Sequence, residues 1–258
     1  MKWPTQVVLV RHGQSEFNVL RVIKERDPLY RKFKQAYEED FTSDKARNLA
    51  EMVLEKYRLD LGDYQTRLTS IGIDQAKITG AGLSLDIEPP DVIYVSPYFR
   101  TRQTLDAMTN AWPELSSAKT TTDDRIREQE HGIQILYNDW RVFHVFHPEQ
   151  KRMRDLFGAY WYQYPQGESM AQVRDRIRSF LTTLVREHAG QKVLLVTHHV
   201  TILCFLASME RLTPEKVTDM DKDLKPVNCG VTFYIGNPDK GQDGRLELTE
   251  YNRKYYSD

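Results

Sequence analysis

The sequence has no marked excess of charge of either sign. Its 36 basic and 37 acidic residues leave a formal net charge of -1 over 258 residues. Binding to nucleic acid or to an acidic membrane favours an overall basic surface, so we expect neither partner, and any anion must be bound by a local cluster. Long apolar runs are also lacking, and Lys2, Pro4 and Gln6 interrupt any signal-peptide pattern. We therefore predict a soluble protein of the cytoplasm.

Cysteine is scarce too. The two cysteines, Cys204 and Cys229, lie far apart in apolar surroundings, which favours buried free thiols over a disulfide or a metal site. His144 and His147 have metal-like spacing, but no set of carboxylates or cysteines lies near them in the sequence. We predict no metal and no other cofactor. A P-loop is absent, which excludes a nucleotide-driven kinase.

What the sequence does contain is a recurring pattern of short β-branched runs that end in polar residues. The runs are Val7–Val10 before Arg11, His12 and Gly13, Asp91–Val95 before Ser96–Arg100, and Val193–Val196 before Thr197, His198 and His199. Ligands of open α/β sheets bind outside the carboxyl ends of the strands. If these strands are neighbours, two histidines and two arginines meet at one edge of the sheet. Such a cluster suits an anionic substrate that becomes covalently attached to histidine.

Strands and helices alternate along most of the chain. Further strands are predicted at 119–122, 230–235 and 245–251, the last two as a hairpin, and helices at 44–57, from 70 to the glycines at 80 and 82, 99–112, 148–162, 170–187 and 199–209, with another opening at Pro214. We therefore predict an α/β fold, with a mixed, mostly parallel central sheet and helices on both faces.

The stretch after the first strand is polar and rich in helical patterns. We predict one domain over residues 1–258 that carries a helical insertion over residues 19–65, because no turn-rich linker separates this stretch from the rest. The insertion is interpreted either as a flap that stabilises the edge of the sheet or as a cover over the site.

Transfer of a phosphoryl group to a side chain requires three kinds of group. These are an unprotonated nucleophile, cations that neutralise the oxygens in transfer, and an acid for the leaving oxygen. His12 is the candidate nucleophile, because a neutral imidazole nitrogen can form a phosphoramidate. Arg11 and Arg100 are candidate clamps, and a protonated His198 would add a donor and a charge.

Longer motifs surround these residues. They are Val10–Asn18, Leu68–Thr69 with Gly72 and Gln75–Ala76, Ser96–Thr104, Arg127–Gly132, Gly167–Ser169 and Thr197–His198. In this order they resemble the signature segments of the histidine phosphatase superfamily, in the branch shared with cofactor-dependent phosphoglycerate mutases. The resemblance covers nearly the whole chain outside residues 19–65. The stretch from Glu128 to Leu184 is most similar to a little-characterised mutase-like phosphatase branch of plants, fungi and bacteria.

The resemblance implies roles for the matching residues. His12 is the nucleophile that becomes phosphohistidine, while Arg11, Arg100 and His198 hold the phosphoryl group with help from Asn18.

The resemblance also implies that Glu128 is the general acid and then the base for water. Spacing alone does not choose between Glu128 and Glu130, whereas the family's offset of four residues to Gly132 favours Glu128.

Two positions depart from the family pattern. His199 stands where the family usually has glycine, and Gln65 where it often has aspartate. If the backbone at position 199 approaches the phosphate, the His199 side chain must point away, so pocket shape or pH response can differ. We include His199 among the predicted substrate-binding residues.

We predict a phosphomonoesterase, a histidine phosphatase that hydrolyses a small phosphorylated metabolite through a phosphohistidine. Phosphoryl transfer of the phosphoglycerate mutase type is the first alternative, although Gln129, Glu130 and His131 supply less positive charge than the Glu-Arg-x-Tyr-Gly segment of the mutases. A non-catalytic scaffold is the second alternative, and it predicts a damaged site, whereas all five predicted groups are present. Neither the substrate nor the oligomeric state can be predicted from the sequence.

Overall fold

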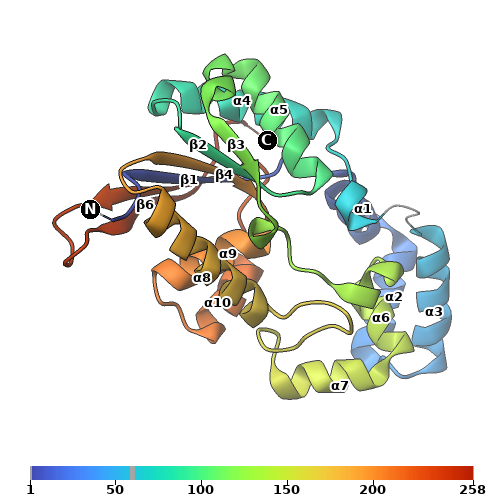
Figure 1. The fold of residues 1–258 in the computed structure, drawn as a ribbon. Coiled ribbons are helices and arrows are strands. Elements are labelled where there is room, and N and C mark those ends of the chain that lie inside the picture. The colour runs from blue at the N-terminus through green and yellow to red at the C-terminus, as the bar shows by residue number, and fades with distance from the viewer. Residues whose placement is uncertain (1, 59–61, 258) are drawn as a thin grey trace. The chain divides into compact units, whose positions relative to one another are not determined.

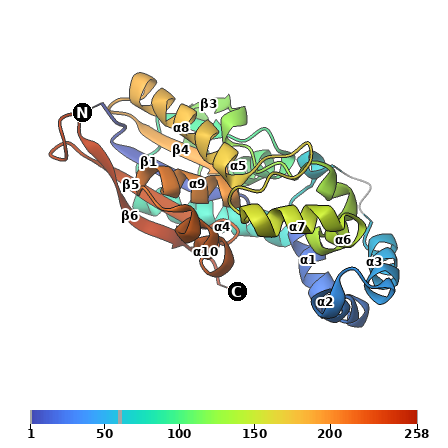
Figure 2. The ribbon, with the colours of Figure 1, turned by 90° about the horizontal axis from the view of Figure 1, so that it is seen from below.

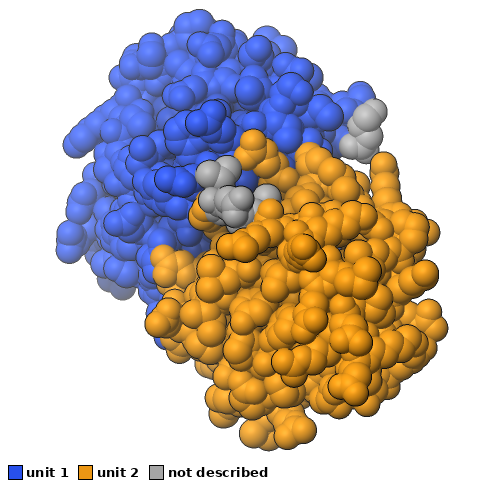
Figure 3. Space-filling view, turned by 90° about the vertical axis from the view of Figure 1, so that its right-hand side faces the viewer, with its two compact units in different colours: residues 1–15, 64–128, 172–258 blue, residues 16–63, 129–171 orange. Residues whose placement is uncertain are grey.

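The structure consists of two compact units, each assembled from separate stretches of the chain. It is a computed structural model that describes residues 2–58 and 62–257. Unit 1 contains Met1–Ser15, Tyr64–Glu128 and Gln172–Asp258, and unit 2 contains Glu16–Asp63 and Gln129–Ala171 (Figure 3). The predicted insertion falls almost entirely in unit 2, together with a stretch that we had not connected to it. The assignment of residues 1–258 to one domain stays a prediction.

Unit 1 is built on a six-stranded sheet with the order β3-β2-β4-β1-β5-β6. The strands are β1 (Gln6–Arg11), β2 (Val92–Val95), β3 (Lys119–Thr122), β4 (Lys192–Thr197), β5 (Val231–Asn237) and β6 (Arg245–Arg253). The first four are parallel, while β5 pairs antiparallel with both β1 and β6. This confirms the predicted mixed, mostly parallel sheet and its terminal hairpin.

The register of the parallel strands brings their carboxyl ends to one edge. Arg11 at the end of β1 is opposite Thr197 at the end of β4, and Val95 at the end of β2 is opposite Val196. The polar residues that follow these three strands therefore start from the same edge of the sheet, as the sequence pattern predicts.

Helices cover both faces of this sheet (Figures 1 and 2). On one face lie α4 (Ser70–Asp86) and α5 (Phe99–Ala111), and on the other lie α8 (Met170–Glu187), α9 (His199–Met209) and α10 (Pro214–Asp223). Short 3-10 helices occur at Asp63–Gln65 (η1), Pro113–Ser117 (η2), Asp124–Ile126 (η3) and Gly132–Tyr137 (η4). The helices confirm the predicted layers.

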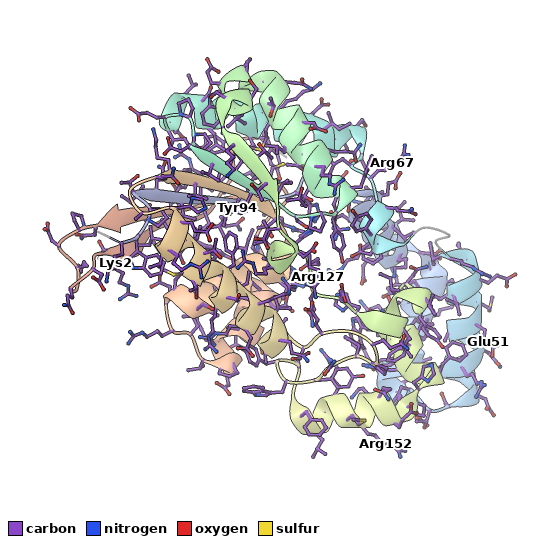
Figure 4. The ribbon with its side chains drawn as sticks, viewed as in Figure 1. Lys2, Glu51, Arg67, Tyr94, Arg127 and Arg152 are labelled. Carbon is purple, nitrogen blue, oxygen red and sulfur yellow. The ribbon has the colours of Figure 1, made fainter. Side chains whose placement is uncertain are left out.

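Successive strand residues pack into the layers on opposite faces. Val8 and Val10 lie in the apolar core that includes Leu83 of α4. Tyr94 of β2, labelled in Figure 4, packs against Phe180 of α8 with ring centroids 5.0 Å apart. Burial on both faces explains why the strands appear in the sequence as continuous apolar runs.

Helix α4 is longer than predicted, since it continues past Gly80 and Gly82 to Asp86. A Cβ atom at Gly80 would lie 2.7 Å from the carbonyl oxygen of Met108 in α5, and one at Gly82 would lie 2.2 Å from the ring of Tyr255. The two glycines therefore permit close packing inside a helix rather than ending it.

Helix α7 (Pro148–Phe157) is shorter than predicted. It ends at Gly158, whose φ of +81° lies in the left-handed region that glycine adopts readily. The aromatic residues after it, up to Tyr162, belong to turns and loops rather than to the helix.

Unit 2 is helical. Its helices are α1 (Glu16–Arg26), α2 (Pro28–Asp40), α3 (Asp44–Lys56), α6 (Trp140–Phe146) and α7. Phe33 of α2, Ala50 of α3 and Val142 of α6 share one apolar core, so the insertion and the later aromatic stretch fold together. Lys24 and Asp139 form a buried ion pair at 3.1 Å, which joins the same two stretches.

None of the helices in the described part of the chain is both long enough and apolar enough to span a bilayer.

Candidate active site

Three of the predicted site residues meet at the carboxyl edge of the unit 1 sheet. The Nε of Arg100 lies 3.3 Å from the Nε2 of His12, and the rings of His12 and His198 lie 5.2 Å apart at an angle of 60°. All three residues are buried: Arg100 is 4% exposed, His12 is 3% exposed and His198 is 0% exposed. The site therefore brings one guanidinium and two imidazoles together, and such groups can donate hydrogen bonds to an anionic ligand.

Hydrogen bonding selects the tautomer of His12. Its Nδ1 lies 2.7 Å from the carbonyl oxygen of Gly13, which can only accept. A neutral His12 therefore carries its proton on Nδ1, and the lone pair is on Nε2, where Arg100 donates. Nε2 is thus the nucleophilic atom, and it lies beside a cation that can hold a phosphate oxygen.

The glycine after His12 is required by close backbone packing. A Cβ atom at Gly13 would lie 2.3 Å from the carbonyl oxygen of Gly72, at the start of α4. The Gly13 N–H donates to Oγ1 of Thr104 (3.0 Å), and that hydroxyl donates to the carbonyl oxygen of Arg100 (2.7 Å). The turn that holds His12 is thereby tied to the helix that holds Arg100.

Arg11 and Arg100 supply the positive charge of the site. The guanidinium of Arg100 lies over the ring of Tyr98, 4.7 Å from its centroid. Arg11 donates to the carbonyl oxygen of Pro226 at 2.6 Å. Burial lowers the pKa of Arg11 to about 10, against the opposing effect of the Glu128 carboxylate. Arg11 therefore remains charged at neutral pH.

His198 is held on one nitrogen only. Its Nε2 lies 2.7 Å from Oγ of Ser96, which is also fully buried, whereas its Nδ1 is buried and has no hydrogen-bond partner among the residues that the structure describes. When the Ser96 hydroxyl donates to Nε2, Nδ1 carries the proton and is a free donor. A buried donor without a partner implies a ligand oxygen that completes it.

Both histidines of the site are neutral. Burial, reinforced by the charges of Arg100 and Arg11, lowers the pKa of His12 well below its ordinary value. Burial and the charge of Arg100 do the same for the pKa of His198. This suits His12 as a nucleophile, and it differs from the protonated His198 of our sequence interpretation. A bound phosphate dianion would raise the pKa of His198 again.

The two neutral histidines predict a loss of stability in acid. Below about pH 6.5 the unfolded chain binds protons that the folded site rejects, so the free energy of unfolding falls by about 1.4 kcal/mol per pH unit for each such histidine. His198→Gln keeps a hydrogen-bonding side chain but cannot titrate. We expect the free energy of unfolding, measured with denaturant, to fall less steeply between about pH 6 and 5 in this variant than in wild type. Equal slopes in variant and wild type would contradict the burial of a neutral His198.

Glu128 follows η3 in the same unit. Its Oε1 accepts a hydrogen bond from the backbone N–H of Val200 (3.2 Å), in the first turn of α9. This contact places the carboxyl group of Glu128 at the N-terminus of α9. Glu130 and Asn18 both belong to unit 2, Glu130 as an exposed residue and Asn18 within α1. The predicted contact of Asn18 with the phosphoryl group stays a prediction.

His199 begins α9, and its side chain pairs with α10. Its Nε2 lies 2.9 Å from Oδ1 of Asp221. The side chain is therefore engaged by a carboxylate, and its predicted role in substrate binding stays a prediction.

The sequence reasoning missed a loop that supports the nucleophile. Asn228 donates from Nδ2 to the carbonyl oxygen of His12 (3.1 Å), and the backbone N–H of Cys229 also donates to that oxygen (3.2 Å). Arg11 donates from its backbone N–H to the carbonyl oxygen of Gly230 (3.1 Å). The loop could have been found from the predicted topology, because a strand that runs antiparallel to β1 must begin where β1 ends.

The histidines with metal-like spacing lie in unit 2 and have other partners. Nδ1 of His144 lies 3.2 Å from the hydroxyl of Tyr37, and Nε2 of His147 lies 2.7 Å from that of Tyr137. Within residues 2–58 and 62–257, no group of three histidine, cysteine or acidic side chains is arranged to hold a metal ion.

Comparison with known families defines the class of protein. Residues 55–242 match the histidine phosphatase superfamily (branch 1), and the chain therefore belongs to this superfamily. The matched range begins after Arg11 and His12, so their assignment depends on the motif and on the geometry described above.

Individual relatives include proteins named as mutases and as phosphatases. The phosphoglycerate mutase-like protein AT74 of Arabidopsis thaliana is 29% identical over 191 residues, which are 71% of this chain and 48% of that protein. The chain thus spans about half of that relative. The probable phosphoglycerate mutase GpmB of Yersinia enterocolitica is 25% identical, with 88% and 83% covered. The broad-range acid phosphatase DET1 of Saccharomyces cerevisiae is 27% identical, with 83% and 80% covered.

Solved structures share the fold. A mycobacterial glucosyl-3-phosphoglycerate phosphatase in complex with inorganic phosphate has a TM-score of 0.64 and 19% identity, covering 97% of this chain and 98% of that one. A putative alpha-ribazole-5'-P phosphatase from Escherichia coli has a TM-score of 0.65 and 15% identity, with the same coverage. At these identities the likeness concerns the fold alone.

Proposed function

We propose that this chain is a phosphomonoesterase that hydrolyses a small phosphorylated metabolite through a phosphohistidine at His12. The observation that carries the proposal is the pairing of a neutral His12 Nε2 with the Arg100 guanidinium at 3.3 Å inside a buried site. A nucleophile beside its anion clamp is the arrangement that covalent phosphoryl transfer requires.

The first half of the reaction forms the phosphoenzyme. Nε2 of His12 attacks phosphorus, and the bond from phosphorus to the ester oxygen breaks. The proton on Nδ1 stays on the ring, where the Gly13 carbonyl stabilises the resulting imidazolium. Arg11, Arg100 and the free donor of His198 stabilise the charge on the oxygens in transfer.

Glu128 supplies the proton chemistry. In its protonated form it gives its proton to the leaving alkoxide, and the alcohol departs. Ionised Glu128 then takes a proton from water as the water oxygen attacks phosphorus. The bond from phosphorus to Nε2 breaks, so phosphate leaves and neutral His12 returns.

Mutase chemistry is the second candidate, and the names of the relatives AT74 and GpmB favour it. A mutase must keep its phosphoenzyme from water and return the phosphoryl group to an acceptor. The segment Gln129, Glu130 and His131 carries no arginine or lysine to hold a second anionic group, which favours hydrolysis.

Two assays on purified protein decide between these candidates. Phosphate release is measured over a panel of phosphorylated sugars, glycerates, alcohols and an aryl phosphate, and phosphoryl transfer is measured between phosphoglycerate isomers. The proposal is supported if phosphate is released from members of the panel faster than the phosphoryl group is transferred between phosphoglycerate isomers. Faster transfer would make the chain a mutase, and inactivity in both assays would support the scaffold.

Vanadate should inhibit the activity, and chelators should not. The cations of the proposed site are arginines, so we expect EDTA to leave phosphate release unchanged. Vanadate takes the five-coordinate geometry of the group in transfer, so we expect it to compete with substrate. Loss of activity in EDTA that a divalent ion restores would contradict the metal-free mechanism.

A further inference from the structure

One arginine holds the backbone that carries Glu128. Arg176 of α8 donates from Nη1 to the carbonyl oxygens of Arg125 (2.7 Å) and Arg127 (2.8 Å). It also donates from Nη2 to the carbonyl oxygen of Glu128 itself (3.1 Å). A single planar guanidinium therefore fixes three carbonyl groups of this segment, which a lysine could not do with the same geometry.

Two threonines complete the attachment, one from the sheet and one from α9. Thr197 at the end of β4 donates to the carbonyl oxygen of Ile126 (2.6 Å), and Thr201 of α9 donates to that of Arg127 (2.5 Å). The carbonyl oxygen of Arg127, a residue labelled in Figure 4, thus accepts hydrogen bonds from both α8 and α9. All four consecutive carbonyl groups from 125 to 128 are bound by side chains, not by a strand ladder or an α-helix.

This attachment matters for the carboxyl group because a proton is transferred only over hydrogen-bond distance. The Glu128 backbone is held by Arg176, and its Oε1 is held by the Val200 N–H in the same turn of α9 as Thr201. A shift of the backbone by about 1 Å at a reacting group can cost about 10²-fold in rate. Loosening the segment should therefore impair proton donation more than nucleophilic attack.

We propose that Arg176 is a positioning residue for the general acid, and that its guanidinium fixes the Glu128 segment so that the carboxyl group reaches the leaving oxygen. This assignment rests on the function proposed above. It extends that function by giving a role to a residue of α8 that contributes through Glu128 rather than by contact with the substrate.

The test compares Arg176→Gln with Arg178→Gln, a matched change on the same helix. Arg178 is exposed, and its guanidinium pairs with Asp175 (3.0 Å) on the same helix. On an alkyl phosphate we expect Arg176→Gln to lower kcat by about 10- to 100-fold, with KM nearly unchanged. On p-nitrophenyl phosphate, whose leaving group needs no proton, we expect phosphoenzyme formation to change little. Arg178→Gln should match wild type on both substrates.

A double-mutant cycle separates positioning from general destabilisation. Once Glu128→Gln has removed the acid, adding Arg176→Gln should cost little further activity on the alkyl phosphate. If Arg176→Gln folds poorly, Thr201→Val removes one hydrogen bond from the same segment, and it should give a smaller effect with the same dependence on the leaving group.

Three results would overturn the assignment. The first is an equal loss in the rate of phosphoenzyme formation on both substrates. The second is a loss of activity in the double variant equal to the product of the single losses. The third is a Glu128→Gln variant whose rate of phosphoenzyme formation does not depend on the leaving group. A wild-type protein that fails to hydrolyse any phosphate ester would instead refute the proposed function.

Discussion

His12→Ala should reduce phosphate release by about 10⁴-fold or more, because it removes the nucleophile on which both half-reactions depend. The residual rate would come from Arg11, Arg100 and His198, which still bind the phosphoryl group. Because His12 is buried, the alanine also leaves a polar cavity, so the variant must be shown to remain folded by its thermal unfolding.

The covalent adduct is the direct measurement. Wild-type protein quenched during turnover of labelled substrate should carry a label that acid removes and base does not, as expected of a phosphohistidine. His12→Ala should carry none. His188→Gln is a suitable control, since His188 lies near the start of β4, bonded to Tyr94 (2.7 Å) and Gln191 (2.7 Å), at the opposite end of that strand. An acid-stable label, or a label that persists in His12→Ala, would place the nucleophile elsewhere.

The meeting of His12, Arg100 and His198 could be predicted because it depends on the strands. Each residue follows a buried apolar run, and parallel neighbours place their carboxyl ends at one edge. The order of the strands in the sheet could not be predicted. The sequence therefore indicates which side chains belong to the site, but not that Arg100 and His12 lie 3.3 Å apart.

The supporting residues could not be predicted, because their roles arise from single contacts. Asn228 lies in a loop without a motif, and its contact with His12 exists only because β5 runs antiparallel to β1. Arg176 appears in the sequence as one of several charged residues on the polar side of an amphipathic helix. Nothing in the helical pattern indicates which of these arginines faces the carbonyl groups of another segment.

The predicted ends of two helices were wrong, because a glycine can either end a helix or permit close packing inside one. Gly80 ends no helix, because α5 packs so closely there that a Cβ atom would collide with the Met108 carbonyl. Gly158 does end α7, because its φ is positive. The residue type is the same, and only the packing of distant segments decides between the two outcomes. The joint packing of residues 16–63 and 129–171 was also missed, because it too depends on contacts between segments that are distant in the sequence.

Glu128→Gln is expected to lower turnover of alkyl phosphates by about 10²- to 10⁴-fold, the range for a lost general acid or base. Glutamine keeps the size of the side chain and an oxygen that can accept from the Val200 N–H, so the geometry of the segment should survive. What it removes is the proton for the leaving alkoxide and the base for water.

Glu130→Gln is the matched control, and it also decides between the two carboxylates that spacing alone could not separate. Glu130 is an exposed residue of unit 2, whereas Glu128 belongs to unit 1 and its charge acts on Arg11. We therefore expect Glu130→Gln to retain wild-type turnover.

The leaving group distinguishes the two roles of Glu128. Because p-nitrophenolate departs without a proton, the burst of phosphoenzyme formation from p-nitrophenyl phosphate should be nearly normal in Glu128→Gln. Hydrolysis of the phosphoenzyme still needs a base, so steady-state turnover should fall and the phosphoenzyme should accumulate. Rapid-quench measurement of the burst and of the bound label tests both steps. If Glu130→Gln proves the sensitive variant, or if Glu128→Gln slows formation of the phosphoenzyme equally on both substrates, Glu128 is not the acid.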